Sequence, residues 1–527
     1  LIFCNTNKAE LVLDLAAADE GVAFRYRFSG HSGAFRTITT ERTGFAVWPS
    51  ARAWLQPYHA ASAYTPAYED FYFQTAPGTP PPKSRAKPLG WSFPALFHTP
   101  GADAWMLLTE SGTDETYCAC HLGPDSSGGL YRMAFPDEQE ATKGQKYQTG
   151  TEPRFTLPWT LPWRVIVLGK SAGDIALSTL VTDLAPPSKI EDTSWIRPGR
   201  ASWSWWAYPD GPNTASLFNK FTDLAADMGW EYTLFDAGWW DVGLRPLADY
   251  ARRRGVAPLA WTSASDFYTP GRTNRKLDEM AAAGVAGVKV DFWCSDRQEA
   301  MAAMHTLFEA AANRRLLVNL HGCTLPRGWH RTWPNLLTAE AVLGTESYMF
   351  EPQFTEGAAE LNTVLPFTRN VGGPMDATPA GFSPKKYPRT TTAAHELAAA
   401  LIFNSGLIHY ADQPDFFQSL PGPVKQVLRD APARWDETRC LAGEPGRVAV
   451  FARRTGRTWF VCGINGTTNT LPVDLDLAAY KRFPRRLLIH EAPAALMQVA
   501  AEPISAVNRW QHPIPPRGGF VLRLDRR

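Results

Sequence analysis

One carboxylate, Asp291, stands at the end of a short apolar run with the sequence Gly287-Val-Lys-Val-Asp-Phe292. Such a run predicts a buried parallel strand, and the strands of a (β/α)8 barrel deliver their last side chains into a concave active-site mouth. An aspartate in this position also serves as a helix cap or a turn residue. The neighbouring candidate residues favour the catalytic interpretation.

Other side chains suited to chemistry follow further predicted strands. They are Trp205, Asp236, Trp261 and His321, with Glu340 and Glu346 just beyond the apolar pair Leu336-Leu337. Glycosidic cleavage needs one acid that protonates the departing oxygen and one carboxylate that meets the oxocarbenium-like centre. Taken singly, Glu340 and Glu346 also fit solvated loop carboxylates, but their spacing of six residues favours a joint role.

These candidates lie where strand and helix patterns alternate. Short apolar runs end at Asp236, Trp261 and Asp291, a helix is expected from about Lys276, and residues 301–311 carry an apolar stripe of helical spacing. Alternation over so many units favours a closed (β/α)8 barrel over an open Rossmann sheet. No G-x-G-x-x-G segment opens a helix here, so dinucleotide binding has no support.

The segments on either side of the barrel have β-type patterns. Val22, Phe24, Tyr26 and Phe28 alternate with arginines, which is typical of a half-buried strand. Near the other end, two apolar runs flank Thr455-Gly456, a hairpin signature. We therefore expect a multidomain α/β protein, with a β-sandwich over residues 1–190, a barrel over residues 191–425 and a second β-sandwich over residues 426–527.

Composition excludes several classes of protein. The chain has 527 residues, 44% of them hydrophobic, and 53 basic against 52 acidic side chains. A nucleic-acid partner is not expected, because no Lys/Arg-rich block stands out. No membrane insertion is expected, because no apolar run approaches about 18 residues. The seven cysteines lack zinc spacing, and the 20 tryptophans suit either sugar stacking or aromatic sandwich cores.

At these residues the chain resembles glycoside hydrolase family 97. The matching segments include Ser202-Trp-Ser-Trp-Trp206, Gly287 to Phe292, Val318-Asn-Leu-His-Gly322, Gly344-Thr-Glu346 and Met375-Asp376, and they are weakest before residue 100. The resemblance implies an N-terminal β-super-sandwich, a central (β/α)8 TIM barrel, a C-terminal β-sandwich and a calcium ion (Ca2+) in the active site. It also implies a bacterial protein that is periplasmic or secreted. We expect the earliest strands of the first domain to be missing, as in a fragment or a short member.

The family divides by mechanism, and the resemblance places this chain in one branch. Inverting, α-glucosidase-like members have a Glu after the His of the Asn-x-His segment, where this chain has Gly322. Retaining, α-galactosidase-like members place a nucleophilic Asp after Lys-Val, which corresponds to Asp291, and their acid/base corresponds to Glu346. The resemblance thus implies that Asp291 attacks the anomeric carbon, that Glu346 protonates the leaving group, and that a covalent glycosyl-enzyme forms.

Sugar-binding residues are expected around this pair. Lys289 precedes Asp291 by two residues, so it faces the same side of the strand and can bond a sugar hydroxyl while it keeps Asp291 ionised. The remaining candidates for the sugar pocket are Trp205, Asp236, Trp239, Trp261 and His321. For His321 the alternative is a strand cap, and we interpret His409 as a packed core histidine. Asp376 and Asp412 fit structural loop roles equally well.

Metal ligands are assigned by resemblance. Glu340 is expected to bind calcium, a hard cation that takes six to eight oxygen ligands. Glu110, in Leu107-Leu-Thr-Glu110 of the first domain, is our candidate for a ligand that crosses the domain interface. A carboxylate at the rim of the site is the alternative for Glu110.

The predicted function is that of a retaining, exo-acting α-galactosidase that acts on an oligosaccharide or another glycoside. Within the same fold, α-glucosidase and β-L-arabinopyranosidase are the close alternatives, because β-L-arabinopyranose superimposes on α-galactose without its hydroxymethyl group. A non-catalytic carbohydrate-binding protein is the alternative of another class. The presence of both Asp291 and Glu346 argues against it. The sequence predicts no oligomeric state.

Overall fold

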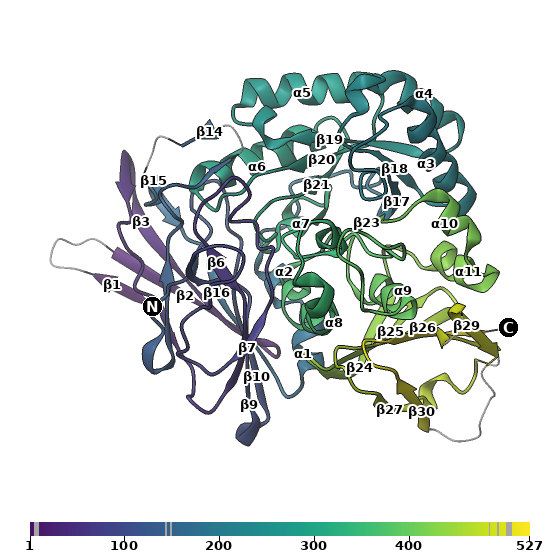
Figure 1. Ribbon diagram of the computed structural model, residues 1–527. Coiled ribbons are helices and arrows are strands. Elements are labelled where there is room, and N and C mark those ends of the chain that lie inside the picture. The colour runs from purple at the N-terminus through teal and green to yellow at the C-terminus, as the bar shows by residue number, and fades with distance from the viewer. Residues whose placement is uncertain are drawn as a thin grey trace.

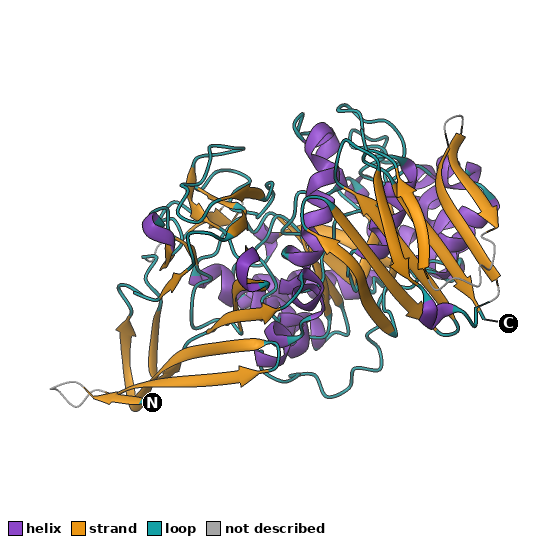
Figure 2. Cartoon of the chain, turned by 90° about the horizontal axis from the view of Figure 1, so that it is seen from below, coloured by secondary structure: helices purple, strands orange, loops and turns teal. Residues whose placement is uncertain are grey.

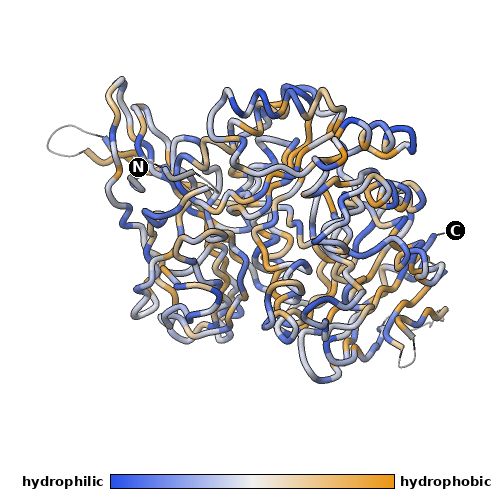
Figure 3. Tube along the Cα trace, turned by 45° about the horizontal axis from the view of Figure 1, so that its top comes forward, coloured by the Kyte–Doolittle hydropathy of each residue, from blue (hydrophilic) through white to orange (hydrophobic). Residues whose placement is uncertain are grey.

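The computed structural model describes residues 1–4, 10–142, 145–147, 150–483, 485–492, 495–501 and 509–526. Figure 1 shows a central region of alternating strands and helices between two regions built of strands. Hydrophobic segments lie inside the central region and hydrophilic helices line its outer edge (Figure 3). None of the helices in the described parts of the chain combines the length and the hydropathy that a bilayer crossing requires.

The central sheet curves into a nearly closed barrel. In the described chain it has seven strands, all neighbours parallel, in the order β22-β21-β20-β19-β18-β17-β23. The strands are β17 (Gly199–Trp203), β18 (Tyr232–Phe235), β19 (Ala257–Ser263), β20 (Gly287–Asp291), β21 (Leu317–Leu320), β22 (Leu336–Ala339) and β23 (Leu407–Tyr410). The predicted parallel barrel is therefore confirmed.

The eighth strand of the predicted barrel is reduced to a single bridge. Ala339 of β22 pairs in parallel with Met375, outside any strand. Pro374 has no N–H to donate, and Gly373 before it has a φ of 136°. These two residues prevent a regular ladder at this position. Sequence periodicity gave no sign of the gap.

Helices cover the outside of the barrel. They are α3 (Ala215–Met228), α4 (Leu244–Arg253), α5 (Pro270–Ala283), α6 (Gln298–Ala312), α7 (Trp329–Thr332), α8 (Phe354–Val364), α9 (Ala393–Ile402), α10 (Pro414–Ser419) and α11 (Gly422–Asp430). The apolar stripe predicted for residues 301–311 is buried along α6. Helix α5 starts earlier than the expected Lys276, because Thr269 caps it and Pro270 occupies its first turn.

The N-terminal domain is a sandwich of antiparallel strands. Its larger sheet contains β1 (Ile2–Cys4), β2 (Glu10–Ala18), β3 (Gly21–Thr37), β16 (Trp163–Gly169), β10 (Ala104–Ser111), β9 (Ala95–Thr99), β5 (Arg52–Leu55), β7 (Phe73–Thr75) and, paired with β3, β15 (Arg154–Thr160). The smaller sheet contains β4 (Gly44–Ala46), β12 (Leu130–Ala134), β11 (His121–Leu122), β8 (Pro88–Trp91) and β6 (Pro57–His59), and β13 (Ala141–Thr142) pairs separately with β14 (Gln145–Lys146). Phe97 and Tyr131 join the two sheets, with ring centroids 5.3 Å apart.

One detail of the first domain differs from the alternation expected for its strand β3. Val22 is 40% exposed, whereas Ala23 beside it is 2% exposed. The reason is that the other face of β3 also has neighbours: Arg25 and Arg27 both pair with Asp14 across the sheet. The predicted strand is present, but its arginine face is as half-buried as its aromatic face. Two short helices, α1 (Ala172–Leu177) and α2 (Leu180–Leu184), follow the sandwich.

The C-terminal domain is a smaller sandwich. One sheet contains β24 (Glu437–Glu444), β25 (Val448–Thr455), β26 (Thr458–Asn465), β31 (Gly519–Asp525), β28 (Arg485–Ala492) and β29 (Ala495–Ala501), and β27 (Leu471–Asp476) pairs with β30 (Arg509–Ile514). The predicted hairpin is present, with Thr455 opposite Thr458. Helix α9 is buried along its whole length because it also packs on β26 and β31. In Figure 2, strands near the C-terminus lie in front of helices.

A buried ion cluster joins the N-terminal domain to the barrel. Glu110 of β10 accepts hydrogen bonds from Arg164 Nη1 at 2.6 Å and from Arg327 Nε at 2.5 Å. Arg164 also donates to Glu41, from Nε at 2.8 Å. Because Arg327 follows β21 of the barrel, its bond to Glu110 fixes the first domain to the barrel.

We predict that Glu110→Ala destabilises the protein by roughly 3–5 kcal/mol, because two buried guanidinium groups lose their shared partner. The midpoint of thermal unfolding should fall by several degrees. Glu444→Ala is the matched control, since it removes a pair with Arg447 whose side chains are 41% and 53% exposed and should cost less than about 1 kcal/mol. Equal shifts for the two variants would contradict the structural role given to Glu110.

Candidate active site

The carboxyl ends of the barrel strands surround a cavity of about 560 Å³. Its walls are formed by Tyr64, Glu69, Arg85, Trp205, Asp236, Ala237, Trp261, Lys289, Asp291, Phe292, Cys294, His321, Gly322, Glu340, Val342, Glu346, Ser347, Phe350 and Glu351. The structure thus brings together all of the predicted site residues except two, Trp239 and Glu110. The cavity is the candidate active site.

The floor of the cavity is a buried ion pair. Lys289 Nζ lies 3.1 Å from Asp236 Oδ2, which also accepts a hydrogen bond of 2.6 Å from Trp203 Nε1. Burial works against the charged form of Lys289, but Asp236, Glu346 and nearby carboxylates outweigh it and raise the pKa of the amine. Lys289 therefore presents a positive charge at the floor of the cavity.

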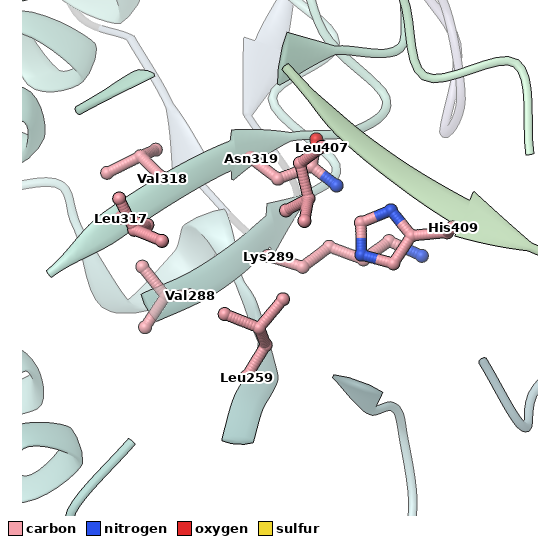
Figure 4. Close-up of a pocket in the computed structure, with 8 residues that line it drawn as sticks. All are labelled: Leu259, Val288, Lys289, Leu317, Val318, Asn319, Leu407 and His409. Carbon is pink, nitrogen blue, oxygen red and sulfur yellow. The ribbon is translucent and has the colours of Figure 1, made fainter. Parts of the chain in front are cut away.

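An aliphatic layer lies beneath this floor inside the barrel. Leu259, Leu317 and Leu407 fill it, with Lys289, Asn319 and His409 at its polar side (Figure 4). The barrel interior is thus a packed core and not a channel. Polar ligands can approach the floor only from the mouth of the barrel.

Asp291 is held by two hydrogen bonds at the end of β20. Its Oδ2 accepts from Trp261 Nε1 at 3.1 Å, and its Oδ1 accepts from the backbone N–H of Phe292 at 2.7 Å. Burial raises the pKa of Asp291, while Lys289 and His321 work in the opposite direction. The backbone after it has positive φ angles of 69° at Phe292 and 45° at Cys294. Such conformations persist only where surrounding structure imposes them, and they are common at functional sites.

Gly322 lies in close contact with Asp291. Its φ is +48°, and a Cβ atom placed there would lie 3.0 Å from Asp291 Oδ1 and 2.9 Å from the backbone nitrogen of Phe292. Any side chain at position 322 therefore competes with the observed position of Asp291. A glutamate at 322 and this placement of Asp291 exclude each other.

Two glutamates beyond β22 differ in their surroundings. Glu340 accepts a hydrogen bond of 2.8 Å from the backbone N–H of Gly322 and lies 3.2 Å from His321 Nδ1. Burial opposes its ionisation, but His321 and Gly322 lower its pKa. Glu346 lies in the 3-10 helix η5 (Thr345–Met349). Burial and the charge of Glu340 raise the pKa of Glu346 to about 8, although Lys289 acts in the opposite direction. A carboxyl group of this kind keeps its proton at neutral pH, as a general acid must.

His321 connects the site to a buried carboxylate. Its Nε2 lies 2.8 Å from Asp376 Oδ2, which also binds His409 Nδ1 at 2.7 Å. Burial lowers the pKa of His321, but Glu340 and Asp376 raise it well above its usual range. Both ring nitrogens already face carboxylates, so a direct bond from His321 to a sugar hydroxyl is not supported. His409 is fully buried, as expected of a core histidine.

The three tryptophans predicted for the sugar pocket do not all reach the cavity. Trp205 and Trp261 line the cavity. Trp239 lies behind Trp261, to whose carbonyl oxygen it donates a hydrogen bond of 2.9 Å. The structure therefore does not bring Trp239 to the wall of the pocket, and its place is one of support for Trp261.

The candidate metal ligand of the first domain needs a correction. Glu110 is fully buried and outside the cavity, and its two oxygens bind Arg164 and Arg327. The carboxylate of this domain that does reach the cavity is Glu69. Burial and the charge of Glu340 raise the pKa of Glu69 well above its usual range, although Arg85 acts in the opposite direction. The signal missed in the sequence is the acidic pair Glu69-Asp70 within an aromatic run.

These carboxylates form a group that could hold a metal ion. Single donor atoms of His321, Glu340 and Glu346 all lie within 4.8 Å of one another. Glu346 and Glu340 both raise the pKa of Glu69. Carboxylates that oppose one another's ionisation fit a cation placed among them, and oxygen donors suit a hard cation.

Three family models match the chain. The model described as Glycosyl-hydrolase 97 N-terminal covers residues 2–187, that described as Glycoside hydrolase 97 covers residues 195–342, and that described as Glycosyl-hydrolase 97 C-terminal, oligomerisation, covers residues 434–525.

Curated relatives match nearly the full chain. A protein of Streptomyces bingchenggensis named "Probable retaining alpha-galactosidase" is 35% identical over 489 residues, which cover 89% of this chain and 71% of the relative. A protein of Bacteroides thetaiotaomicron named "Retaining alpha-galactosidase" is 26% identical, with 98% of this chain and 84% of the relative covered.

Solved structures share the fold. A beta-arabinopyranosidase superimposes with a TM-score of 0.91 at 29% identity, with 99% of this chain and 86% of that chain covered. A Glycoside Hydrolase Family 97 enzyme from Pseudoalteromonas sp. strain K8, in complex with acarbose, superimposes with a TM-score of 0.82 at 20% identity, with the same coverage.

Proposed function

The chain belongs to glycoside hydrolase family 97, so it is a glycoside hydrolase, and we propose that it is a retaining, exo-acting α-galactosidase. The two curated relatives named as retaining α-galactosidases support this substrate. A closed floor supports the exo mode of action, because Asp236 and Lys289 end the cavity at the barrel interior. Only the terminal sugar of a chain fits against such a floor.

In the proposed first step, Asp291 attacks the anomeric carbon while Glu346 protonates the departing oxygen. The galactosyl group is then bound to Asp291 as an ester. In the second step, Glu346 removes a proton from water, which attacks the same carbon and releases Asp291. Two displacements at one carbon return the α configuration.

The observation that carries this proposal is the contact geometry at Gly322. A retaining enzyme needs the nucleophile close to the sugar, and Asp291 Oδ1 lies only 3.0 Å from where a Cβ atom at position 322 would stand, so a side chain there would force it to shift. The water-activating Glu that the inverting branch has at this position is thus missing here, and Asp291 stands in its place. Burial, the main cause of the raised pKa of Glu346, supports its role as the acid of the first step.

We also propose that the site takes calcium. Glu69 and Glu340 would hold the ion beside Glu346, and His321 would balance the charge of Glu340 from the other side. When bound, calcium supplies positive charge that offsets the clustered carboxylates and orients sugar hydroxyl groups. Calcium is favoured over a softer metal because the donors that face the cavity are carboxylate oxygens.

β-L-Arabinopyranosidase is the second candidate function, since a structure with that name superimposes with a TM-score of 0.91. The two sugars differ by one hydroxymethyl group. The ratio of kcat/KM values for nitrophenyl α-galactoside and nitrophenyl β-L-arabinopyranoside separates the two activities. Hydrolysis of the α-glucoside alone would overturn both candidates, and tight sugar binding without turnover of any glycoside would favour a non-catalytic protein.

Removal of the nucleophile gives a direct prediction. Asp291→Gly should lower kcat/KM for an aryl α-galactoside by a factor on the order of 10⁴ or more. Sodium azide should restore turnover and yield β-galactosyl azide, because azide enters from the face that Asp291 vacates. Asp278→Asn is the control, since Asp278 is 68% exposed on α5 and is not among the residues of the cavity wall. Azide products of α configuration would contradict the assignment.

A single methyl group at position 322 should also impair the enzyme. Gly322→Ala should lower kcat/KM at least about tenfold, because the new Cβ would lie 2.9 Å from the backbone nitrogen of Phe292 and 3.0 Å from Asp291 Oδ1, so the carboxylate must shift from its position. Gly229→Ala is the matched control, since Gly229 has a φ of +66° and open space around its Cβ position. Both variants carry the left-handed backbone penalty of roughly 1 kcal/mol. If both variants lost activity equally, the contact with Asp291 would not be the cause.

Calcium dependence gives a third prediction. Treatment with EDTA should abolish hydrolysis, and added calcium should restore it. Glu69→Gln should raise the calcium concentration for half-maximal activity at least about tenfold, because a charged oxygen ligand is lost. Glu444→Gln, an exposed substitution in the C-terminal domain, serves as the control. Activity that is indifferent to EDTA would remove calcium from the proposal.

A further inference from the structure

Two exposed aromatic rings stand at the mouth of the catalytic cavity. Tyr64 is 59% exposed and Phe350 is 53% exposed, and both line the cavity. Single exposed apolar residues are common on protein surfaces. Two large rings that line one cavity are a different case, because apolar surface gathered at a concave site marks a place where a ligand is bound.

Tyr64 stands next to the nucleophile. It belongs to a loop of the N-terminal domain between β6 and β7. Its ring centroid lies 5.8 Å from that of Phe292, the residue directly after Asp291. Phe292 in turn lies 6.1 Å from Trp261, which donates a hydrogen bond to Asp291. The first domain thus places an aromatic ring above the reacting carboxylate.

Phe350 stands next to the acid. It caps the 3-10 helix η5 that carries Glu346, with its N–H bound to Ser347 O at 3.1 Å. Its ring centroid lies 5.9 Å from that of Trp205, which also lines the cavity. A group protonated by Glu346 leaves along this wall.

The direction of the leaving group follows from the closed floor. The sugar that reacts lies against Lys289 and Asp236, where only the barrel interior continues. Its substituent at the anomeric carbon therefore extends toward the mouth, past Glu346. The polar side chains there are Arg85 and Glu351, which pair at 2.7 Å and line the same cavity.

We propose that Tyr64 and Phe350 form a subsite for the leaving group, and that the natural substrate carries a second pyranose there. This inference rests on the proposed function. A pyranose presents flat C–H faces, which pack on aromatic rings, and a rim of hydroxyl groups, which Arg85 and Glu351 can bind. The cavity volume of about 560 Å³ leaves room beyond one terminal sugar.

Two substrates that differ only in the leaving group test the inference. Melibiose, α-galactosyl-(1→6)-glucose, places a pyranose in the subsite, whereas α-galactosyl fluoride places a single atom near the acid. For Tyr64→Ala and for Phe350→Ala, we expect the ratio of kcat/KM for melibiose to kcat/KM for the fluoride to fall roughly three- to tenfold. The main change should appear in KM for melibiose.

Controls separate the loss of the ring from other effects. Tyr64→Phe and Phe350→Tyr keep a ring and should keep the ratio close to that of the wild type. Trp48→Ala removes an aromatic side chain that is 62% exposed and is not among the residues of the cavity wall, and it should leave the ratio unchanged.

The outcomes are distinct. An equal fall for melibiose and the fluoride, no change in the ratio, or a wild type that hydrolyses the fluoride but not melibiose would overturn the inference and leave the proposed function standing. A wild type that does not hydrolyse α-galactosyl fluoride would overturn the function, and the inference with it.

Discussion

The barrel mouth holds several acidic side chains in a buried space, and the rest of the site depends on how their charges are balanced. Burial and the charge of Glu340 raise the pKa of Glu346 to about 8. Lys289 and His321 supply the opposing positive charge, and each is itself fixed by a further carboxylate, Asp236 in one case and Asp376 in the other. The balance is therefore set by ion pairs that extend beyond Asp291 and Glu346 themselves.

The different surroundings of Asp291 and Glu346 suit the different roles proposed for these two carboxyl groups. Asp291 receives N–H groups from Trp261 and Phe292, which stabilise its charged form. Burial raises the pKa of Glu346, which suits the acid role proposed for it. The N-terminal domain contributes Glu69 to the same charge cluster and is fixed to the barrel by Glu110 and its two arginines. The site is thus shared between two domains, and the position of one depends on the other.

Sequence reasoning placed the barrel residues of the site, Trp239 aside, around one cavity, because strand ends are fixed by short apolar runs that end in a polar residue, as at Asp291. It failed where position depends on contacts across domains. Glu110 and Glu69 are both acidic residues near aromatic ones, and only the packing of the first domain decides which reaches the cavity. Local sequence also could not show that Trp239 supports Trp261 from behind, or that the eighth strand is reduced to a single bridge at Met375.

The central claim is that the sugar is bound for a moment to Asp291 and leaves with the configuration it had in the substrate. Proton NMR of the hydrolysis of an aryl α-galactoside tests this claim most directly, if the anomeric signals are followed before mutarotation. The account predicts that α-galactose appears first and that the β-anomer grows only later. If β-galactose appeared first, the reaction would invert the anomeric centre, and Asp291 could not be the nucleophile.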